Sequence, residues 1–263
     1  MYTNWEEKNF SEEKKFFDNR CKELNIHNWL EDYKNQLLPE DIPKNTINWF
    51  SHERFYPISG VSTYSIRALA IMYCGFCLVT KKLADVLASY LKEKSNKPNP
   101  RVLELGCGLG SLAKALSDRG IDIQGIDNFE REGTFHFKEN SWIDDIIEMD
   151  MKEAVITYGK TADFILCSWP EMEGHIDQIP KLMYQVNPSC KMVYLGEDIG
   201  GCTANDRFFN VVNEIDSMQS VNDVYCRWEG IHDYWSLLQW DCEGERDYDN
   251  KRRACNPYPI WVE

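Results

Sequence analysis

The sequence predicts an α/β protein whose mostly parallel sheet is covered by helices and closed by an antiparallel hairpin. Three observations predict it. From about residue 98, short apolar runs alternate with amphipathic runs, a pattern typical of parallel sheets. Near the C-terminal end, two aromatic-rich runs at 224–230 and 233–241 are separated only by a short turn, which indicates a hairpin. Residues 1–97 show helical spacing instead, and predict a helical extension.

Composition and charge exclude several classes of protein. The chain has 263 residues, 43% of them hydrophobic, so it can bury a sizeable core. Its formal net charge of −14 disfavours nucleic-acid partners and anionic membrane surfaces. The charged residues 1–17 lack the apolar core of a signal peptide, and the most apolar stretch, 60–80, contains Arg67. We therefore expect a cytoplasmic protein without a membrane span.

The first hundred residues divide into helical and turn-rich parts. Apolar residues recur at helical spacing over 5–38, and Pro39 and Pro43 then break the pattern. An aromatic-rich segment, 49–77, leads into two apolar helical stretches that end near Lys94. The polar, proline-containing residues 92–100 indicate a linker. We accordingly predict a helical extension or lid over 1–97 and a ligand-binding α/β domain over 98–263.

Ten cysteines are scattered through apolar segments, as expected of reduced, buried thiols. Cys74 and Cys77 form a single CxxC pair without a second pair at ligand spacing. We therefore predict no metal site, and we interpret the pair as two small apolar residues on a helix.

The α/β part contains the following runs. Strand-like runs occupy 101–106, 122–127, 162–169 and 191–197, and helical runs occupy 111–120, 179–186 and 206–215. The charge-dense residues 241–253 are interpreted as a solvated loop.

A glycine-rich turn follows the first of these strands, in the sequence VLELGCGLGS. Gly106 and Gly108 fit the dinucleotide fingerprint G-x-G-x-x-G/A, but Ser111 occupies its third position. Gly110 lies one residue early, and Glu104 stands where the NAD pattern is normally apolar. Both departures count against an NAD(P) site.

The segment LELGCGLG resembles the first motif, hh(D/E)hGxGxG, of the class I S-adenosylmethionine-dependent methyltransferases. The resemblance extends over roughly 98–245 and names no subfamily. It implies a Rossmann-like, seven-stranded methyltransferase sheet, mostly parallel with a C-terminal antiparallel hairpin, and S-adenosyl-L-methionine as cofactor. N-terminal additions in this family often form a lid or the substrate pocket.

The resemblance also implies roles for individual residues in cofactor binding. Glu104 would receive the amino group, and Asp127, at the end of the second strand, would bind the ribose hydroxyls. Asp150 would lie near the adenine amine, although an acid after a strand is often only a helix cap. Tyr64 is a candidate for the cofactor carboxylate, with a buried aromatic cluster as the alternative. The remaining expected contacts are Gly106, Cys107, Gly108, Gly110, Asn128, Met151 and Cys167.

Candidate catalytic residues follow the later strands. Ser168 and Trp169 end the fourth strand beside the expected methyl position, Glu197 follows the fifth, and Tyr56 lies in the aromatic segment. Each has a structural alternative, namely core packing for Trp169 and Tyr56 and loop solvation for Glu197. Residues 168–171 lack the Asn/Asp-Pro-Pro-aromatic signature of many nucleic-acid and glutamine methyltransferases.

Two classes of function follow. The first is a methyltransferase acting on a small molecule or a basic protein side chain, at nitrogen, because acids cluster at the strand ends. The second is a catalytically silent module that binds S-adenosylmethionine and a partner protein. An NAD(P) reductase is a distant third. The sequence leaves the oligomeric state open.

Overall fold

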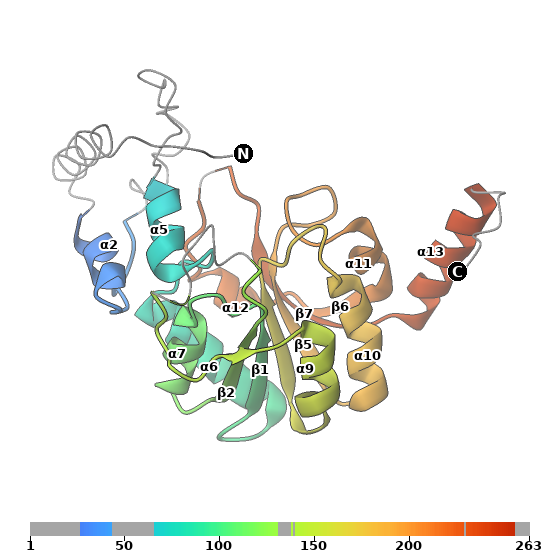
Figure 1. Cartoon of the computed structure of the whole chain (residues 1–263), viewed down its shortest axis with the longest axis horizontal. Coiled ribbons are helices and arrows are strands. Elements are labelled where there is room, and N and C mark those ends of the chain that lie inside the picture. The colour runs from blue at the N-terminus through green and yellow to red at the C-terminus, as the bar shows by residue number, and fades with distance from the viewer. Residues whose placement is uncertain (1–26, 44–65, 131–137, 139, 229, 256–263) are drawn as a thin grey trace, which may run out of the picture.

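The structure is a computed structural model that describes residues 27–43, 66–130, 138, 140–228 and 230–255. Its centre is a seven-stranded sheet in the order β3-β2-β1-β4-β5-β7-β6 (Figure 1). β1 to β5 are parallel, whereas β7 runs antiparallel to both β5 and β6. The strands are β1 Arg101–Leu105, β2 Asp122–Asp127, β3 Ile147–Glu148, β4 Phe164–Ser168, β5 Lys191–Gly196, β6 Val212–Asp216 and β7 Tyr234–Trp240. This is the fold class that the sequence predicts.

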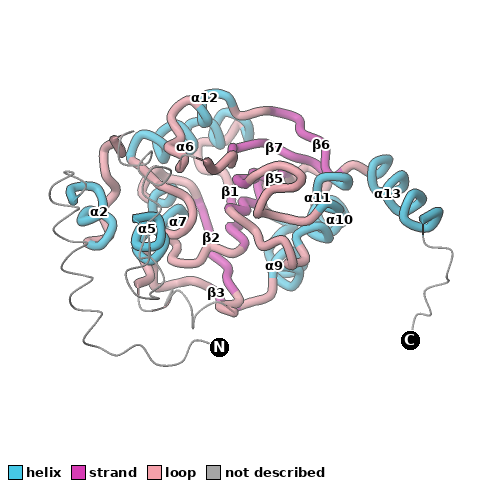
Figure 2. Tube along the Cα trace, turned by 90° about the horizontal axis from the view of Figure 1, so that it is seen from above, coloured by secondary structure: helices cyan, strands magenta, loops and turns pink. Residues whose placement is uncertain are grey.

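Helices cover both faces of the sheet (Figure 2). One face carries α5 Ile66–Cys74, α6 Lys81–Ser95, α7 Ser111–Ser117 and α12 Gln219–Asn222, with α2 His27–Lys34 beyond them. The other carries α9 Met151–Tyr158, α10 Ile179–Val186 and α11 Asp206–Val211, with the 3-10 turns η2 Gly159–Thr161 and η3 Ile176–Gln178. The last helix, α13 Cys242–Cys255, extends away from the body (Figure 1).

The central strands are buried on both faces, as parallel strands between helices must be. In β4, Phe164 and Leu166 belong to the core beneath α6 and α7, while Ile165 and Cys167 belong to the core beneath α9 and α10. Because side chains alternate along a strand, each position of a central strand can be assigned to one face.

Helix α6 packs within the main core rather than apart from it. Its residues Leu83, Leu87 and Leu91 are fully buried in the cluster that also holds Leu112 and Leu116 of α7. The helix lies before residue 97, within the predicted extension. The boundary at residue 97 stays a prediction. Cutting the chain there would remove α6 and expose the apolar side chains of α7 that pack against it, such as Leu112 and Leu116.

The predicted hairpin is wrong in one of its two strands. Residues 224–228 form no strand, and the antiparallel partner of β7 is β6, which lies in a run expected to be helical. No side chain of β6 is buried, so this edge strand lacks the apolar alternation by which strands are recognised. Tyr225 and Trp228 are aromatic because they enter the main core instead.

Two local expectations are also corrected. Residues 242–255 are the helix α13 and not a loop, and Glu243 and Arg246 form an ion pair one helical turn apart, which supports it. Cys74 ends α5, but Cys77 follows Gly75, whose φ of 91° ends the helix, so only one of the two cysteines is helical. Both are buried free thiols.

Two wider expectations can be compared with the described part of the chain. Within it, no group of three or more potential ligands is arranged to hold a metal ion. No helix among these residues has the length and apolarity required to cross a membrane. The cytoplasmic location stays a prediction.

The buried start of α6 provides a test of stability. Thr80 is the N-cap, 1% exposed, and its hydroxyl accepts a hydrogen bond from the Leu83 N–H at 3.1 Å. We expect Thr80→Ala to lower the free energy of unfolding by about 1 kcal/mol, because that N–H loses its partner. Denaturant unfolding measures this. The control is Ser89→Ala on the exposed face of the same helix, expected to change stability by less than about 0.5 kcal/mol; equal losses would contradict the capping role.

Candidate active site

The loop between β1 and α7 depends on its glycines. Gly106, Gly108 and Gly110 have φ values of 69°, 53° and 72°, in the left-handed region that other residues rarely adopt. A Cβ on Gly110 would also lie 2.6 Å from the Ile143 side chain. The Cys107 N–H donates to the Ile126 carbonyl at 3.0 Å, and its side chain is buried. The loop thus presents its backbone, without Cβ atoms at these glycines, at the carboxyl end of β1.

Glu104 is a carboxyl group buried in the central strand. It is 3% exposed, and its side chain lies on the α7 face, where the backbone N–H of Ala113 partly stabilises the charged form. Burial, reinforced by Asp127, nevertheless raises the pKa of Glu104 to about 8. Among the described residues its Oε2 atom has no hydrogen-bond partner. A buried acid with an unsatisfied oxygen fits a cationic donor such as an ammonium group.

Asp127, the last residue of β2, connects that strand to the glycine loop. Its Oδ2 accepts the Gly108 N–H at 2.8 Å, and its Oδ1 accepts the Phe129 N–H at 2.7 Å. Asn128 follows it and is exposed. Asp127 therefore joins the end of β2 to the glycine loop, and a role toward ligand hydroxyls stays a prediction.

Asp150 acts as the N-cap of α9, accepting the Lys152 N–H at 2.8 Å. The contact observed is therefore the helix-cap alternative, and a role of Asp150 and the adjacent Met151 toward adenine stays a prediction. Cys167 is buried on the α9 face of β4, and burial raises its pKa to about 12, so this thiol remains protonated at neutral pH.

The residue after β4, Trp169, is a centre of contacts. Its φ is 55°, and its N–H donates to the Leu195 carbonyl at 2.8 Å, next to Ser168 at the strand end. Its ring stacks on Phe76 with 5.7 Å between centroids, and the Arg67 guanidinium lies 5.3 Å from the ring centre. The ring is partly buried against the main core, so it both packs and borders the strand end.

Asp233 was not anticipated from the sequence. It is 2% exposed, and its Oδ2 accepts from Trp169 Nε1 at 2.9 Å and from the Tyr225 hydroxyl at 2.6 Å. No described residue bonds its Oδ1, which is buried. Burial raises the pKa of Asp233. The sequence does show an acid directly before the apolar run of β7. It does not show that β7 pairs with β5, which is what brings Asp233 beside Trp169.

The register of β5 and β7 places Asp233 opposite Glu197. Tyr234 pairs with Gly196 in antiparallel register. Asp233, which precedes Tyr234, therefore lies opposite Glu197, which follows Gly196. The two oxygens of Glu197 accept the His232 N–H at 3.0 Å and the Cys202 N–H at 2.8 Å. Burial alone would raise the pKa of Glu197, but these N–H donors lower it. Glu197 thus binds two loops, and a catalytic role for it stays a prediction.

Two predicted residues, Tyr56 and Tyr64, lie outside the described residues. The others meet at one end of the sheet. Because the carboxyl ends of β1, β4 and β5 and the start of β7 coincide, the structure brings together Glu104, the glycine loop, Ser168, Trp169 and Glu197.

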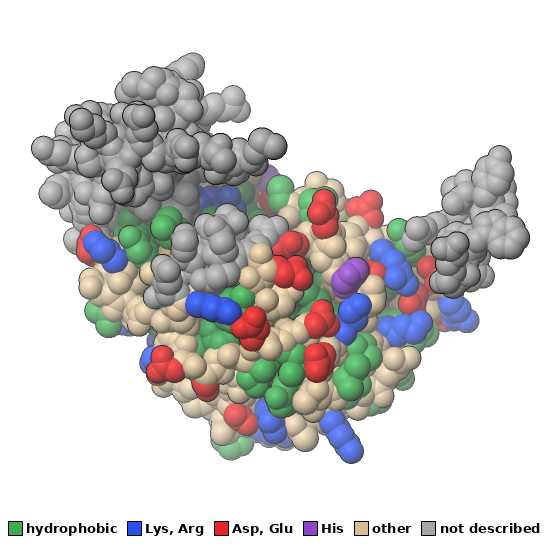
Figure 3. Space-filling view, in the orientation of Figure 1, with side chains coloured by type: hydrophobic (Ala, Val, Ile, Leu, Met, Phe, Trp, Pro, Cys, Tyr) green, Lys and Arg blue, Asp and Glu red, His purple; other side chains and the backbone are tan. Residues whose placement is uncertain are grey.

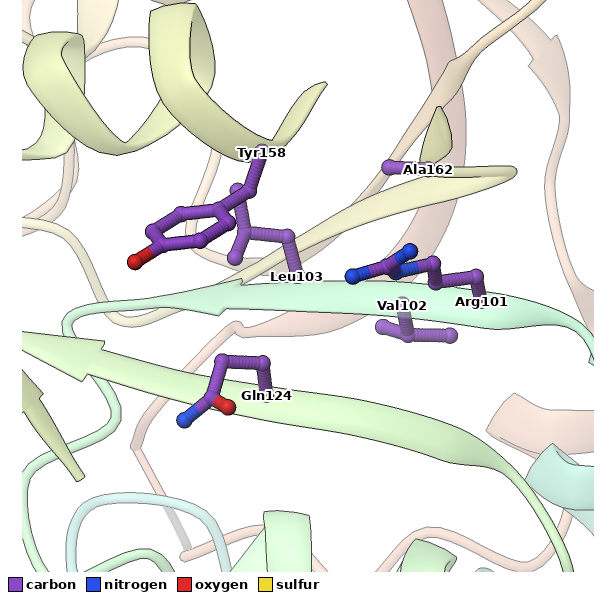
Figure 4. Close-up of a pocket in the computed structure, with 6 residues that line it drawn as sticks. All are labelled: Arg101, Val102, Leu103, Gln124, Tyr158 and Ala162. Carbon is purple, nitrogen blue, oxygen red and sulfur yellow. The ribbon is translucent and has the colours of Figure 1, made fainter. Parts of the chain in front are cut away.

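A small hollow lies elsewhere, at the beginning of β1. Its lining includes Tyr158 from the end of α9 and Gln124 of β2 (Figure 4). The whole lining consists of Arg101, Val102, Leu103, Gln124, Tyr158 and Ala162. Arg101 starts β1, about 17 Å of strand before the glycine loop. None of the predicted site residues borders this hollow.

The amino-acid sequence matches a known family of enzymes. Residues 78–195, from the turn before α6 to the end of β5, match the family model described as a methyltransferase domain. These residues form a methyltransferase domain. The match confirms the family resemblance, the transferase class and S-adenosylmethionine as the cofactor, and it leaves the subfamily unspecified.

Solved methyltransferases are similar to this chain at low identity. The plantazolicin methyltransferase BpumL with SAH is 22% identical over 44% of this chain and 46% of that one, with a TM-score of 0.34. The mitomycin 7-O-methyltransferase MmcR is 13% identical over 62% and 55%, with a TM-score of 0.36. The magnesium protoporphyrin IX methyltransferase ChlM of Synechocystis PCC 6803 with SAM is 14% identical over 74% and 92%, with a TM-score of 0.38.

The chain spans about half the length of BpumL and MmcR. At these values the similarities carry no argument about substrate or mechanism. No curated protein sequence matches the chain.

The residues of the methyltransferase site fit the cofactor. The orphan Oε2 of Glu104 suits the amino group of its methionine part, and the three left-handed glycines let the backbone approach closely. Asp127 lies beside the same loop and accepts the Gly108 N–H. The assignment of each residue to each cofactor group stays a prediction.

Glu104 makes cofactor binding depend on protons. At pH 7, below its pKa of about 8, Glu104 is protonated in the free chain. The cofactor's ammonium group favours the carboxylate, so binding should release close to one proton at pH 7 and none above about pH 9. Calorimetry in buffers of different ionisation enthalpy measures this release. Glu104→Gln should abolish it and weaken binding about tenfold or more; an unchanged release would place the cation elsewhere.

Proposed function

We propose that this chain transfers the methyl group of S-adenosylmethionine to a nitrogen atom of a small molecule or of a basic protein side chain. The observation that carries the proposal is the buried Oδ1 of Asp233, which no described residue hydrogen-bonds, next to Trp169 at the end of β4. A buried carboxyl oxygen at that place can accept the proton of an N–H nucleophile.

The placement of the acids supports this function. Glu104 on β1 and Asp233 before β7 project on the same sheet face, since their strand neighbours Val102 and Trp235 belong to the same core. The thiol of Cys77 lies within electrostatic reach of both acids. Two strands, β4 and β5, lie between β1 and β7, so the separation of the acids is on the order of 15 Å. The cofactor and its acceptor can therefore occupy the two sides of the β4 end.

The acidic character of this end also favours a nitrogen acceptor. Figure 3 shows Asp and Glu side chains on the upper part of the molecule, near the carboxyl ends of the strands. Together with the net charge of −14, they attract amines and repel anions at long range.

The mechanism follows from these positions. When bound, the cofactor supplies an electrophilic methyl group on a sulfonium. Glu104 would hold the amino group of its methionine part and Asp127 its ribose hydroxyls, and Trp169 borders the space beside β4, where its ring can face a cation. Asp233 holds the nucleophile and takes its proton, so that the nitrogen lone pair is aligned with the methyl group.

The test of function uses the full chain with S-adenosylmethionine and pooled small amines or lysine- and arginine-containing peptides. We expect acceptor-dependent formation of S-adenosylhomocysteine, measured by mass spectrometry, and a mass gain of one methyl group on the acceptor. Cofactor binding without turnover on any pool would instead favour a catalytically silent binding module. The full chain is required, because truncation near Lys97 would remove α6 from the core.

Asp127 provides a matched binding test. We expect Asp127→Ala to raise the dissociation constant for S-adenosylmethionine about thirtyfold, the equivalent of about 2 kcal/mol for lost charge-assisted hydrogen bonds. Calorimetry measures this, and thermal unfolding of the variant checks that the glycine loop still folds. Asp122→Ala, at the exposed start of the same strand, is the control. Unchanged affinity in Asp127→Ala would show that the ribose lies elsewhere.

A further inference from the structure

Two polar groups beside Trp169 have no hydrogen-bond partner among the described residues, and one is an acceptor whereas the other is a donor. The Oδ1 atom of Asp233 is buried and needs a donor. Arg67 on α5 is half-buried, and its guanidinium forms no hydrogen bond or ion pair with any described residue, so it needs an acceptor. Both contact the same ring, Asp233 at Nε1 and Arg67 over the centre at 5.3 Å. A half-buried cation and a buried acid that do not pair with each other can be satisfied by one ligand that lies between them.

The guanidinium lies over the Trp169 ring and interacts electrostatically with the acidic residues on the acceptor side of the site. Its strongest charge interactions are with Asp233, Cys202 and Glu197, all near the ends of β5 and β7. Glu104, on the cofactor side, interacts instead with Asp127. Arg67 is therefore placed to meet the acceptor and not the cofactor's own carboxylate.

The chemistry of the guanidinium selects the ligand group. A planar arginine fork matches a carboxylate with two parallel hydrogen bonds, and stacking on Trp169 limits the orientations of its plane. Burial lowers the pKa of Arg67, yet Asp233 opposes this, and an arginine remains charged throughout the ordinary pH range. Burial removes water from the charged guanidinium of Arg67, and an anionic group on the acceptor would replace those lost interactions.

We propose that Arg67 and Asp233 form a two-point acceptor site for a small molecule that carries both a carboxylate and an amino group. This inference rests on the proposed function and narrows its acceptor from amines in general to amino carboxylates. Arg67 binds the carboxylate, and Asp233 holds the amine. The N–C bond forms as the C–S bond breaks, its electron pair stays on sulfur, and the amine proton leaves through Asp233 to solvent.

The experiment compares amino carboxylates with their methyl esters, which keep the amine and lose the anion. The probes are glycine, β-alanine, 4-aminobutyrate, 6-aminohexanoate and 4-aminobenzoate, each titrated into the full chain saturated with S-adenosylhomocysteine. We expect at least one acid to bind about tenfold or more tightly than its ester, the effect of one charge-assisted contact. In Arg67→Met this preference should disappear, and in Arg67→Lys part of it should return.

Controls separate this role from general charge and from folding. Arg246→Met removes an exposed arginine on α13 and should leave the preference for acids unchanged. Asp233→Asn and Tyr225→Phe should weaken the acid and its ester alike, because both carry the amine. Thermal unfolding identifies any variant that has lost its fold. If Asp233→Asn does not fold, Tyr225→Phe still tests the site, because it removes a hydrogen bond to Asp233 and leaves the carboxylate in place.

The outcomes distinguish this inference from the proposed function. Equal binding of acids and esters, binding of none of the acids, or a preference that survives in Arg67→Met would each overturn the acceptor site. A tenfold loss of S-adenosylmethionine affinity in Arg67→Met would reassign the guanidinium to the cofactor. Turnover of an uncharged or cationic amine, unaffected by Arg67→Met, would retain the methyltransferase and reject only the two-point site.

Discussion

The parallel pairing of β1 with β2 and β4 is the constraint on which the site depends. It puts the glycine loop, Asp127 and Trp169 at one edge, because parallel strands in register end together. It also leaves Glu104 with Gly125 on one side and Leu166 on the other, neither of which has a side chain able to hydrogen-bond a carboxyl group. The same pairing that builds the core therefore leaves Glu104 with a buried oxygen that no described residue hydrogen-bonds.

Buried carboxyl oxygens without partners are costly, and native proteins keep few of them. Within the described residues two carboxyl groups, Glu104 and Asp233, contain such an oxygen. Both lie on the α7 face of the sheet near the carboxyl ends of its parallel strands, and both are almost fully buried beside the main apolar core. A core chosen for stability alone would have apolar residues at both positions, so their location argues for ligand binding.

The sequence was sufficient for the parts of the molecule that rest on local pattern. Strands β4 and β5 are apolar over most of their length, and β1 and β2 lie on either side of the glycine loop and its helix at the spacing expected of a βαβ unit. The glycine spacing separated a methyltransferase loop from a dinucleotide loop. The sequence was insufficient where the pattern is weak or non-local. Strand β6 exposes its side chains, and α13 is too charged to show an apolar face. Asp233 and Arg67 meet at Trp169 from positions far apart in the chain, so their juxtaposition depends on the tertiary fold.

Charge links the two ends of the site. A cation held near Glu104 and the end of β4 favours the ionised forms of both Glu104 and Asp233, whose pKa values burial raises in the free chain. Asp233 is therefore ionised over a wider pH range when the positively charged cofactor is bound. Methyl transfer moves the positive charge from sulfur to the acceptor nitrogen, where the ionised carboxylate of Asp233 can pair with the new ammonium group until its proton passes to solvent. The buried position of Asp233 thereby couples its ionisation to the presence of a cation in the site.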